Sequence, residues 1–302
     1  MSENTKKGII IKGIAGFYYT EIGDAVFECK ARGVFRKMGI TPLAGDHVTV
    51  TIGENGKGWI EEIEERQTVL ERPPVANVDR VYIVASAADP APSPIVIDRL
   101  CAICEDKGIE PSVVFNKTDL EDITEFAEIY RKSGIKTYLV CCKTGEGIDE
   151  LKQSLIGKIN VFAGNTGVGK SSLLNMIDNR FSLETGETSK KLGRGRHTTR
   201  WVELLKLESG GYVADTPGFA SVDMEKQWIY KENLQFAFRE FEPYIGKCKF
   251  VSCSHTGEKG CAICEAVESG DISKSRHQNY VTLYREMSEI KDWERDKMQF
   301  QK

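Results

Sequence analysis

The sequence predicts a multidomain α/β protein built from a small β-barrel, a parallel sheet covered by helices on both faces, and a helical metal-binding segment. Three observations support this organisation. Short apolar runs separated by turn residues occupy residues 1–72, strands alternate with helices over residues 73–224, and cysteines gather with a histidine within residues 225–302. Because 302 residues are enough for two or three domains with a core in each, we take these three ranges as the predicted domains.

Composition limits the possible partners and locations of the chain. The net charge is −4, so any contact with nucleic acid must come from local basic patches. Nine cysteines without a signal peptide indicate a reducing compartment. No apolar run approaches the length that spans a bilayer. We therefore expect a soluble, cytoplasmic protein that contacts no membrane.

The first 72 residues contain candidate strands at 8–19, 25–35, 47–52 and 58–63, with turn residues between them. Evenly spaced short strands of this kind favour a small barrel, and the OB-fold suits the length. Basic and aromatic residues occur together on the early strands: Lys12, Lys30, Arg32, Arg36 and Lys37 with Phe17, Tyr18, Tyr19 and Phe35. Such a face suits looped or single-stranded RNA, although aromatic residues in small barrels more often fill the core. Arg72, Pro73 and Pro74 then suggest a stiff linker.

Residues 164–171 match G-x-x-x-x-G-K-[ST], the phosphate-binding loop, between an apolar strand at 159–163 and a helix at 172–177. The predicted nucleotide contacts are Gly164, Asn165, Thr166, Gly167, Val168, Gly169, Lys170, Ser171 and Ser172. Glycines let backbone N–H groups point into one concavity, and the helix N-terminus adds partial positive charge. Lys170 would reach the β- and γ-phosphates, and the Ser171 hydroxyl would hold Mg²⁺. The alternative is a glycine-rich turn with a chance lysine.

A guanine-reading motif precedes that loop. Strands are predicted at 80–85 and 110–115 with a helix at 95–107 between them, and the second strand ends in Asn116, Lys117, Thr118 and Asp119. The Asp119 carboxylate can accept from both N1–H and the 2-amino group of guanine, donors that adenine lacks at these positions. Asn116 would support the base edge, and the Lys117 stem would lie across the purine.

A second guanine loop is predicted at Cys141, Cys142 and Lys143, which resembles the Ser-Ala-Lys loop of GTPases. In that loop a backbone N–H faces the guanine O6. Because the main contact is a backbone donor, we expect the two cysteines to be compatible with nucleotide binding.

Two segments after the phosphate loop resemble the switches of Ras-like GTPases. In the basic segment 190–200, Thr198 or Thr199 would close onto Mg²⁺ and the γ-phosphate. Residues 215–218 spell D-T-P-G, in which Asp215 would contact Mg²⁺ through water and the Gly218 N–H would contact the γ-phosphate.

The residue after this motif is Phe219, where Ras-like enzymes carry the glutamine that orients the attacking water. Phenylalanine can neither donate nor accept a hydrogen bond, so we expect slow intrinsic hydrolysis that a partner accelerates. His197 is the nearest candidate in sequence for a catalytic role, and the alternative is that it contacts RNA phosphate.

The base-reading motifs precede the phosphate loop, so the order is circularly permuted relative to Ras-like GTPases. Permutation preserves a sheet because domain termini often lie close together. The second switch then runs directly into the C-terminal segment.

Within the last domain the spacing is Cys248-x4-Cys253-x-His255-x5-Cys261. Three thiolates and an imidazole this close together favour a structural Zn²⁺ site over buried free thiols. Cys264 is a fifth candidate for four positions. Cys101 and Cys104 have a redox spacing but lie inside a predicted helix, so we expect them to pack.

The flanking segments of this domain are expected to be helical. Residues 227–246 read as a helix with Trp228, Phe236, Phe238 and Phe241 as packing residues. The terminal helix would bury Tyr280, Leu283, Met287 and Ile290, which recur at helical spacing.

The chain resembles the ribosome small-subunit-dependent GTPase A family (RsgA, also called YjeQ) over nearly its whole length. The resemblance rests on the order of its features: the barrel, N-K-T-D, G-N-T-G-V-G-K-S, G-R-H-T-T, D-T-P-G-F and the zinc pattern. The resemblance implies an OB-fold, a circularly permuted GTPase domain and a zinc-binding domain. It implies GTP hydrolysis stimulated by the 30S subunit during its late maturation, with contacts to 16S rRNA. It also selects Cys248, Cys253, His255 and Cys261 as the zinc ligands, which leaves Cys264 out.

We accordingly expect a monomer that binds GTP with Mg²⁺ and one Zn²⁺, and that binds no DNA. Two other functions are compatible with parts of the sequence. The first is an RNA-binding assembly scaffold in which GTP only sets the conformation. The second is an ATP-dependent kinase, against which Asn116 and Asp119 argue.

Overall fold

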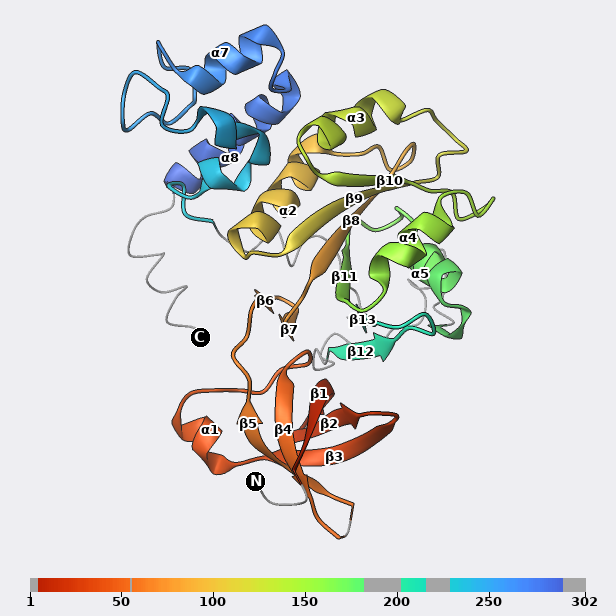
Figure 1. Ribbon diagram of the computed structural model, residues 1–302. Helices are drawn as coiled ribbons and strands as arrows, with labels where there is room; N and C mark the ends of the chain where they lie inside the picture. The colour runs from red at the N-terminus through yellow and green to blue at the C-terminus, as the bar shows by residue number, and fades with distance from the viewer. Residues whose placement is uncertain (1–4, 55, 182–201, 216–228, 290–302) are drawn as a thin grey trace.

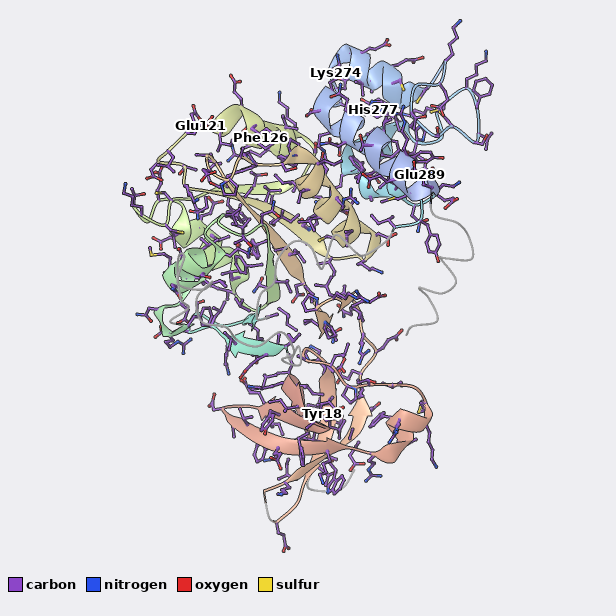
Figure 2. The ribbon with its side chains drawn as sticks, turned by 180° about the vertical axis from the view of Figure 1, so that it is seen from behind. Tyr18, Glu121, Phe126, Lys274, His277 and Glu289 are labelled. Atoms are coloured by element: carbon purple, nitrogen blue, oxygen red, sulfur yellow. The ribbon has the colours of Figure 1, made fainter. Side chains whose placement is uncertain are left out.

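The computed structural model describes residues 5–54, 56–181, 202–215 and 229–289 (Figure 1). A β-barrel lies at one end of the molecule, a sheet with helices on both faces lies in the middle, and a helical part lies at the other end (Figure 1). In the view from behind, Tyr18 of the barrel is far from the helix that runs from Lys274 to Glu289 (Figure 2).

Five strands close the N-terminal barrel: β1 (Thr5–Ile14), β2 (Phe17–Ile22), β3 (Ala25–Ala31), β4 (His47–Ile52) and β5 (Gly58–Ile63). They pair in the order β1-β2-β3-β5-β4, and β4 returns to β1. The short helix α1 (Gly33–Lys37) follows β3. The closed barrel confirms the predicted fold class.

Two expected strands of the barrel were wrong in extent. The run 8–19 is divided because Ala15 and Gly16 take left-handed φ values of 50° and 83°, which turn the chain between β1 and β2. The run 25–35 ends as a strand at Ala31, and Phe35 points from α1 into the barrel core. Tyr18 is partly buried against the same core, whereas Phe35 is buried, so Phe35 is not available to an outside ligand.

The expected linker is instead the turn of a hairpin. β6 (Val69–Glu71) pairs with β7 (Pro74–Ala76), and Pro73 lies in the turn between them. Gly45 has φ 94°, and a Cβ on it would lie 2.0 Å from the carbonyl oxygen of Ala76. The hairpin is therefore packed tightly against the barrel.

The central sheet has the order β10-β9-β8-β11-β13-β12. Its strands are β8 (Arg80–Ser86), β9 (Glu110–Asn116), β10 (Lys136–Leu139), β11 (Ile159–Ala163), β12 (Glu203–Lys206) and β13 (Tyr212–Asp215). All neighbours are parallel except β12 with β13. Although β8 and β9 come earlier in the chain, β8 lies next to β11, so the carboxyl ends of these strands share one edge.

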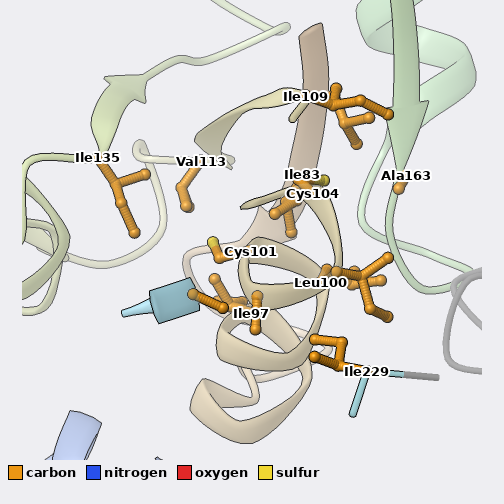
Figure 3. Packing of buried hydrophobic residues seen from close by; sticks show 14 of the residues in the cluster. Ile83, Ile97, Leu100, Cys101, Cys104, Ile109, Val113, Ile135, Ala163 and Ile229 are labelled. Atoms are coloured by element: carbon orange, nitrogen blue, oxygen red, sulfur yellow. The ribbon is translucent and has the colours of Figure 1, made fainter. Parts of the chain in front are cut away.

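Helices cover both faces of this sheet. Buried residues of α2 (Pro94–Asp106) pack with Ile83 and Val113 on one face (Figure 3), and those of α3 (Thr124–Lys132) belong to the same core. Buried residues of α4 (Ile148–Leu155) and α5 (Lys170–Ile177) pack with Tyr82 and Val84 on the opposite face of the sheet. Cys101 and Cys104 lie in the first of these cores, as the packing prediction requires (Figure 3).

The barrel and the central sheet are joined by strand pairing. β1 pairs with β12 at Lys12 and Glu203, and the two side chains form an ion pair. Glu21 of β2 accepts hydrogen bonds from Lys206 Nζ at 2.6 Å and from the Tyr212 hydroxyl at 2.9 Å. Lys12 therefore helps to join the barrel to the central sheet. It does not belong to an exposed basic face, contrary to our expectation from the sequence.

Among residues 229–289, the described stretch of the C-terminal part, there are two 3₁₀ turns, η3 (Leu234–Ala237) and η4 (Arg239–Tyr244), and two helices, α7 (Ala262–Ser269) and α8 (Lys274–Glu289). The continuous helix expected at 227–246 was wrong, because Phe238 is extended between η3 and η4, and Pro243, which lies within η4, has no N–H for an α-helical hydrogen bond. Phe238 and Phe241 are buried as expected, whereas Phe236 is 63% exposed. The terminal helix buries Tyr280, Leu283 and Met287; Trp228 and Ile290 lie outside the described residues.

Charged contacts fix the C-terminal part on α2. Arg276 is 1% exposed, and it donates to Asp98 at 2.6 Å and to Glu240 at 2.7 Å. Asn279 also donates to Asp98, at 2.6 Å. A buried arginine with two carboxylate partners defines one docking geometry, since losing a partner would leave a charge uncompensated. No helix within the described ranges is long and apolar enough to span a membrane.

Candidate functional site

The phosphate loop joins β11 to α5, and its glycines are required by close packing. Gly164 has φ 149°, and a Cβ there would lie 2.2 Å from the carbonyl oxygen of Val84 on β8. Gly169 has φ 93°, and a Cβ there would lie 2.3 Å from Asn116 Nδ2. Larger residues would therefore push the loop away from both neighbouring strands.

Lys170 is the first residue of α5, and its ammonium folds back over the loop. Its Nζ donates to the carbonyl oxygens of Gly164 at 2.6 Å and Asn165 at 2.9 Å. Burial lowers the pKa of Lys170 to about 8. Ser171 and Ser172 follow in the first turn of α5, whose N-terminus favours anions. A phosphate would give the lysine the negative partner that these carbonyl contacts do not supply.

Asn116 connects the three predicted nucleotide motifs. It ends β9 and is 2% exposed. Its Nδ2 donates to the carbonyl oxygen of Val168 in the phosphate loop at 3.0 Å, and its Oδ1 accepts from the Cys142 N–H at 3.3 Å. Motifs that are 52 and 26 residues apart from Asn116 in sequence thus meet at one side chain.

Lys117 also contacts the phosphate loop. It has a left-handed φ of 66°, which turns the chain after β9. Its Nζ donates to the carbonyl oxygen of Gly167 at 2.9 Å and to that of Asp89. The lysine stem consequently runs alongside the loop, where it can support a purine ring.

Asp119 is held by the side chain of Cys141. The thiol of Cys141 donates to Asp119 Oδ1 at 3.2 Å, and Lys143 Nζ lies 3.6 Å from Oδ2. The thiol hydrogen bond, with help from Lys143, lowers the pKa of Asp119. An ionised carboxylate at this position can accept two donors of guanine.

We did not predict this role of Cys141 from the sequence, because we expected only backbone contacts from the two cysteines. The signal was available, since a thiol, like the serine hydroxyl it replaces, can donate a hydrogen bond.

The switch residues are only partly described. Asp215 ends β13, the parallel neighbour of β11, which places its backbone at the same sheet edge as the phosphate loop. His197, Thr198, Thr199 and Gly218 lie outside the described residues.

The four predicted zinc ligands form one cluster. The ligand atoms of Cys248, Cys253, His255 and Cys261 all lie within 4.8 Å of one another. His255 Nδ1 is 3.5 Å from Cys248 Sγ and 3.4 Å from Cys261 Sγ, and the two sulfurs are 3.8 Å apart. Ligand atoms around a tetrahedral Zn²⁺ lie about 3.5–3.8 Å apart. The residues present therefore fit a closed structural zinc site.

Cys264 lies beside this cluster but is not part of it. Its sulfur is 4.0 Å from the carbonyl oxygen of His255 and 4.0 Å from His277 Nε2. The geometry thus agrees with the ligand set that the family resemblance selected.

Gln235 orients the histidine of the cluster. Its Oε1 lies 3.0 Å from His255 Nε2, which leaves Nδ1 facing the three sulfurs. This partner could not be predicted from the sequence, because a polar residue twenty positions before the histidine has no metal-site spacing.

Replacing Gln235 with alanine should lower zinc affinity about 10- to 100-fold, because an orienting partner of a metal-bound histidine is lost. Competition with a coloured chelator at fixed pH measures this. Gln235→Glu keeps an acceptor oxygen at the same place and should retain tight binding. Equal zinc affinity of Gln235→Ala and the unmodified chain would show that the contact does not support the site.

Comparisons with known proteins match almost the entire chain. The family model described as RsgA GTPase matches residues 63–225, and that of the RsgA N-terminal domain matches residues 7–60. A protein of Caldanaerobacter subterraneus named small ribosomal subunit biogenesis GTPase RsgA is 46% identical over 286 residues, covering 94% of this chain and 96% of the relative. A protein of the same name from Alkaliphilus metalliredigens is 44% identical, covering 93% and 97%.

Two solved structures share the fold. YjeQ from Thermotoga maritima superposes with a TM-score of 0.83 at 38% identity, over 95% of this chain and all of that one. YloQ, described as a circularly permuted GTPase, superposes with a TM-score of 0.81 at 36% identity, over 96% of this chain and 98% of that one.

Proposed function

This chain belongs to the RsgA GTPase family and is a GTP hydrolase, and on that premise we propose that it binds the small (30S) ribosomal subunit and acts in its late maturation. In this proposal the subunit stimulates hydrolysis of GTP to GDP and phosphate. The shared name of the relatives, small ribosomal subunit biogenesis GTPase, supports this assignment.

The observation that carries the nucleotide assignment is the contact between Asn116 and the phosphate loop. The hydrogen bond to Val168 and the tight approach of Gly169 hold the base-reading motif against the phosphate cradle. One guanine nucleotide can therefore place its base at Asp119 and its phosphates at Lys170.

We assign the Mg²⁺ of this site to Ser171 and Thr199, with Asp215 acting through water. Ser171 lies in the first turn of α5 and Asp215 ends the strand beside β11, so both positions suit an oxygen-coordinated cation. When bound, Mg²⁺ neutralises charge on the β- and γ-phosphates. Whether Thr198 takes the place of Thr199 is decided by substituting each separately.

Hydrolysis needs a group that orients water, and Phe219 follows the D-x-x-G motif where that group is normally found. We propose that the ribosomal subunit supplies or positions the missing group, with His197 as the candidate from this chain. Lys170 holds the phosphates, and the Gly218 N–H reports whether the γ-phosphate is present.

We propose that the barrel contacts 16S rRNA through the outer face of β2, β3 and β5. Lys30 on β3 pairs with Phe17 on β2 at one side and with Trp59 on β5 at the other, so the three residues lie in one row across the strands. Lys30 Nζ lies 5.0 Å from the centre of the Phe17 ring, and Trp59 is 48% exposed. Aromatic faces beside a lysine suit unpaired bases and their phosphates.

The remaining parts of the proposal are one structural Zn²⁺ per chain, a monomeric state and a cytoplasmic location. The Cys₃His geometry supports the metal. Reduced cysteines outside the cluster, two of them buried in α2, suit a reducing compartment.

The decisive experiment is GTP turnover of the zinc-loaded chain with and without purified 30S subunits. We expect stimulation of about 1,000-fold, the lower end of what a supplied catalytic group contributes. Free 16S rRNA should not substitute for the subunit. Binding without stimulation would favour the scaffold function, and competition by ATP as effective as that by GTP would contradict the guanine site.

A further inference from the structure

One row of backbone pairs crosses the junction between the barrel and the central sheet. Lys12 on β1 is paired with Glu203 on β12, and Glu203 is paired with Asp215 on β13. Asp215 begins the D-x-x-G motif, and we have assigned it to Mg²⁺. A residue of the barrel and a residue of the proposed magnesium site therefore lie on either side of one short strand, β12 (Figure 1).

The same row reaches the barrel face that we propose for RNA. Ile14, two residues beyond Lys12 on β1, is paired with Phe17 on β2, and Phe17 is paired with Lys30 on β3. Every step from this face to β12 is thus a strand pair or a step along β1. Paired strands lie about 4.8 Å apart and share hydrogen bonds, so ordering of one strand also restrains the next.

Side chains of the barrel hold the β12–β13 hairpin at both ends. Lys12 forms an ion pair with Glu203 at the sheet edge where the phosphate loop lies. Glu21 accepts hydrogen bonds from Lys206 and Tyr212, which are opposite each other at the other edge. The two contacts are three residues apart along β12, which is about 10 Å. The first contact is therefore the one beside the nucleotide site.

The ion pair between Lys12 and Glu203 is poorly suited to stabilising the fold. The two side chains remain 28% and 39% exposed, and ion pairs as exposed as this contribute little to stability. Removing one charge should therefore leave the chain folded, and Glu21 should keep the barrel docked. The loss should chiefly loosen the point where the barrel meets β12.

Two sites can be coupled through order alone. When one ligand has ordered a shared segment, a second ligand loses less entropy on binding, even without a change of shape. The row from the barrel face to Asp215 is such a shared segment, and the Lys12–Glu203 pair lies at its centre.

We propose that Lys12 is a positioning residue of the nucleotide site: through Glu203 it lets RNA bound at the barrel order β12 and the end of β13 that carries Asp215. This inference rests on the proposed function for the identity of the RNA. The link itself lies within the chain and can be measured without the ribosome. Because coupling is reciprocal, GTP should order the barrel strand β1 by the same route.

The test measures the affinity of the full-length, zinc-loaded chain for a non-hydrolysable GTP analogue with and without purified 30S subunits. We expect the subunit to raise this affinity about 5- to 150-fold, the usual strength of coupling between two sites. Lys12→Met removes the charge and keeps the aliphatic stem, and it should lower this coupling factor about 5-fold or more. A contact that only docks the barrel would weaken subunit binding equally with and without the analogue, and the factor would not change.

Exchanging the charges provides the rescue. Lys12→Glu alone places two carboxylates together and should lose the coupling. Lys12→Glu combined with Glu203→Lys restores an ion pair and should recover the factor to within about 2-fold of the unmodified chain. Glu21→Gln is the matched control, because it removes one charge from the same junction at the opposite end of the hairpin. It should change the factor by less than about 2-fold.

Hydrogen exchange of the chain alone gives a readout that needs no ribosome. Compared with GDP, the GTP analogue should slow exchange across β1 in the unmodified chain and in Glu21→Gln. It should have no effect there in Lys12→Met, because the link to β12 is lost.

An unchanged coupling factor in Lys12→Met, or an equal loss in Glu21→Gln, would overturn the inference. If 30S subunits do not alter the affinity of the unmodified chain for the analogue, the proposed ribosomal role fails. The exchange across β1 then decides on the link by itself. A nucleotide effect that disappears in Lys12→Met supports the link, and one that persists there, or that is absent in the unmodified chain, contradicts it.

Discussion

Asp119→Asn is expected to lower the affinity for GDP by about 1,000-fold or more, because a site built to hydrogen-bond a base rejects one whose donors it cannot pair. The asparagine amide offers one acceptor and one donor where the carboxylate offers two acceptors. Its NH₂ would oppose the 2-amino group of guanine. Xanthine carries a carbonyl at that position, so the variant should bind xanthosine diphosphate more tightly than GDP. Displacement of a fluorescent nucleotide measures both affinities.

The control for this experiment is Asp122→Asn, three residues along the chain. The Asp122 carboxylate accepts from the N–H of Thr124, the first residue of α3, at 2.9 Å, and it takes no part in the contacts of the base-reading motif described above. It should leave GDP affinity unchanged. An Asp119→Asn variant that still prefers GDP to xanthosine diphosphate would place the base elsewhere.

Cys261→Ser is expected to abolish stoichiometric zinc binding and to unfold residues 246–272. Cys261 is fully buried at the start of α7 and contacts both Cys248 and His255. The loop before it is polar, so metal coordination, worth about 10–16 kcal/mol in zinc-finger peptides, supplies most of its stability. Hydrogen exchange should rise across these residues, whereas GDP affinity should be retained because the phosphate loop packs in a separate core.

Cys264→Ser is the control for Cys261→Ser. It tests whether zinc is lost only when a ligand is replaced, or whenever any cysteine near the cluster is replaced. The Cys264 sulfur lies outside the cluster, so this variant should keep one zinc per chain and low exchange. Loss of zinc in both variants, or exchange that stays low when a chelator removes the metal, would contradict the assignment.

The parts of the site that could be predicted are those with dense local signals. The phosphate loop, Asn116 to Asp119, and the zinc ligands each combine several required residues within a short segment, and the structure brings them together. The strand pattern also predicted the barrel, because turn residues mark where its strands end.

The features that the sequence did not predict are backbone turns without a typical turn residue and contacts between residues distant in sequence. Ala15 takes a left-handed turn that its residue type does not favour, so the strand 8–19 seemed continuous. Phe236 matched a helical pattern, but the chain there forms the short 3₁₀ turn η3, which ends before the extended Phe238, and the Phe236 ring is exposed to water. Asp98 and Arg276 are 178 residues apart, and no local pattern predicts their contact.

The pairing of β1 with β12 and the burial of Arg276 against Asp98 fix both ends of the molecule to one central body. A molecule joined in this way cannot change the distance between its two ends when it binds. If the barrel binds 16S rRNA as proposed and another part of the same body binds a second RNA element, full affinity requires the two RNA elements to lie at one fixed separation, since only then does the second contact form without loss of freedom. Such a factor would distinguish a correctly shaped particle from one in which either element is displaced.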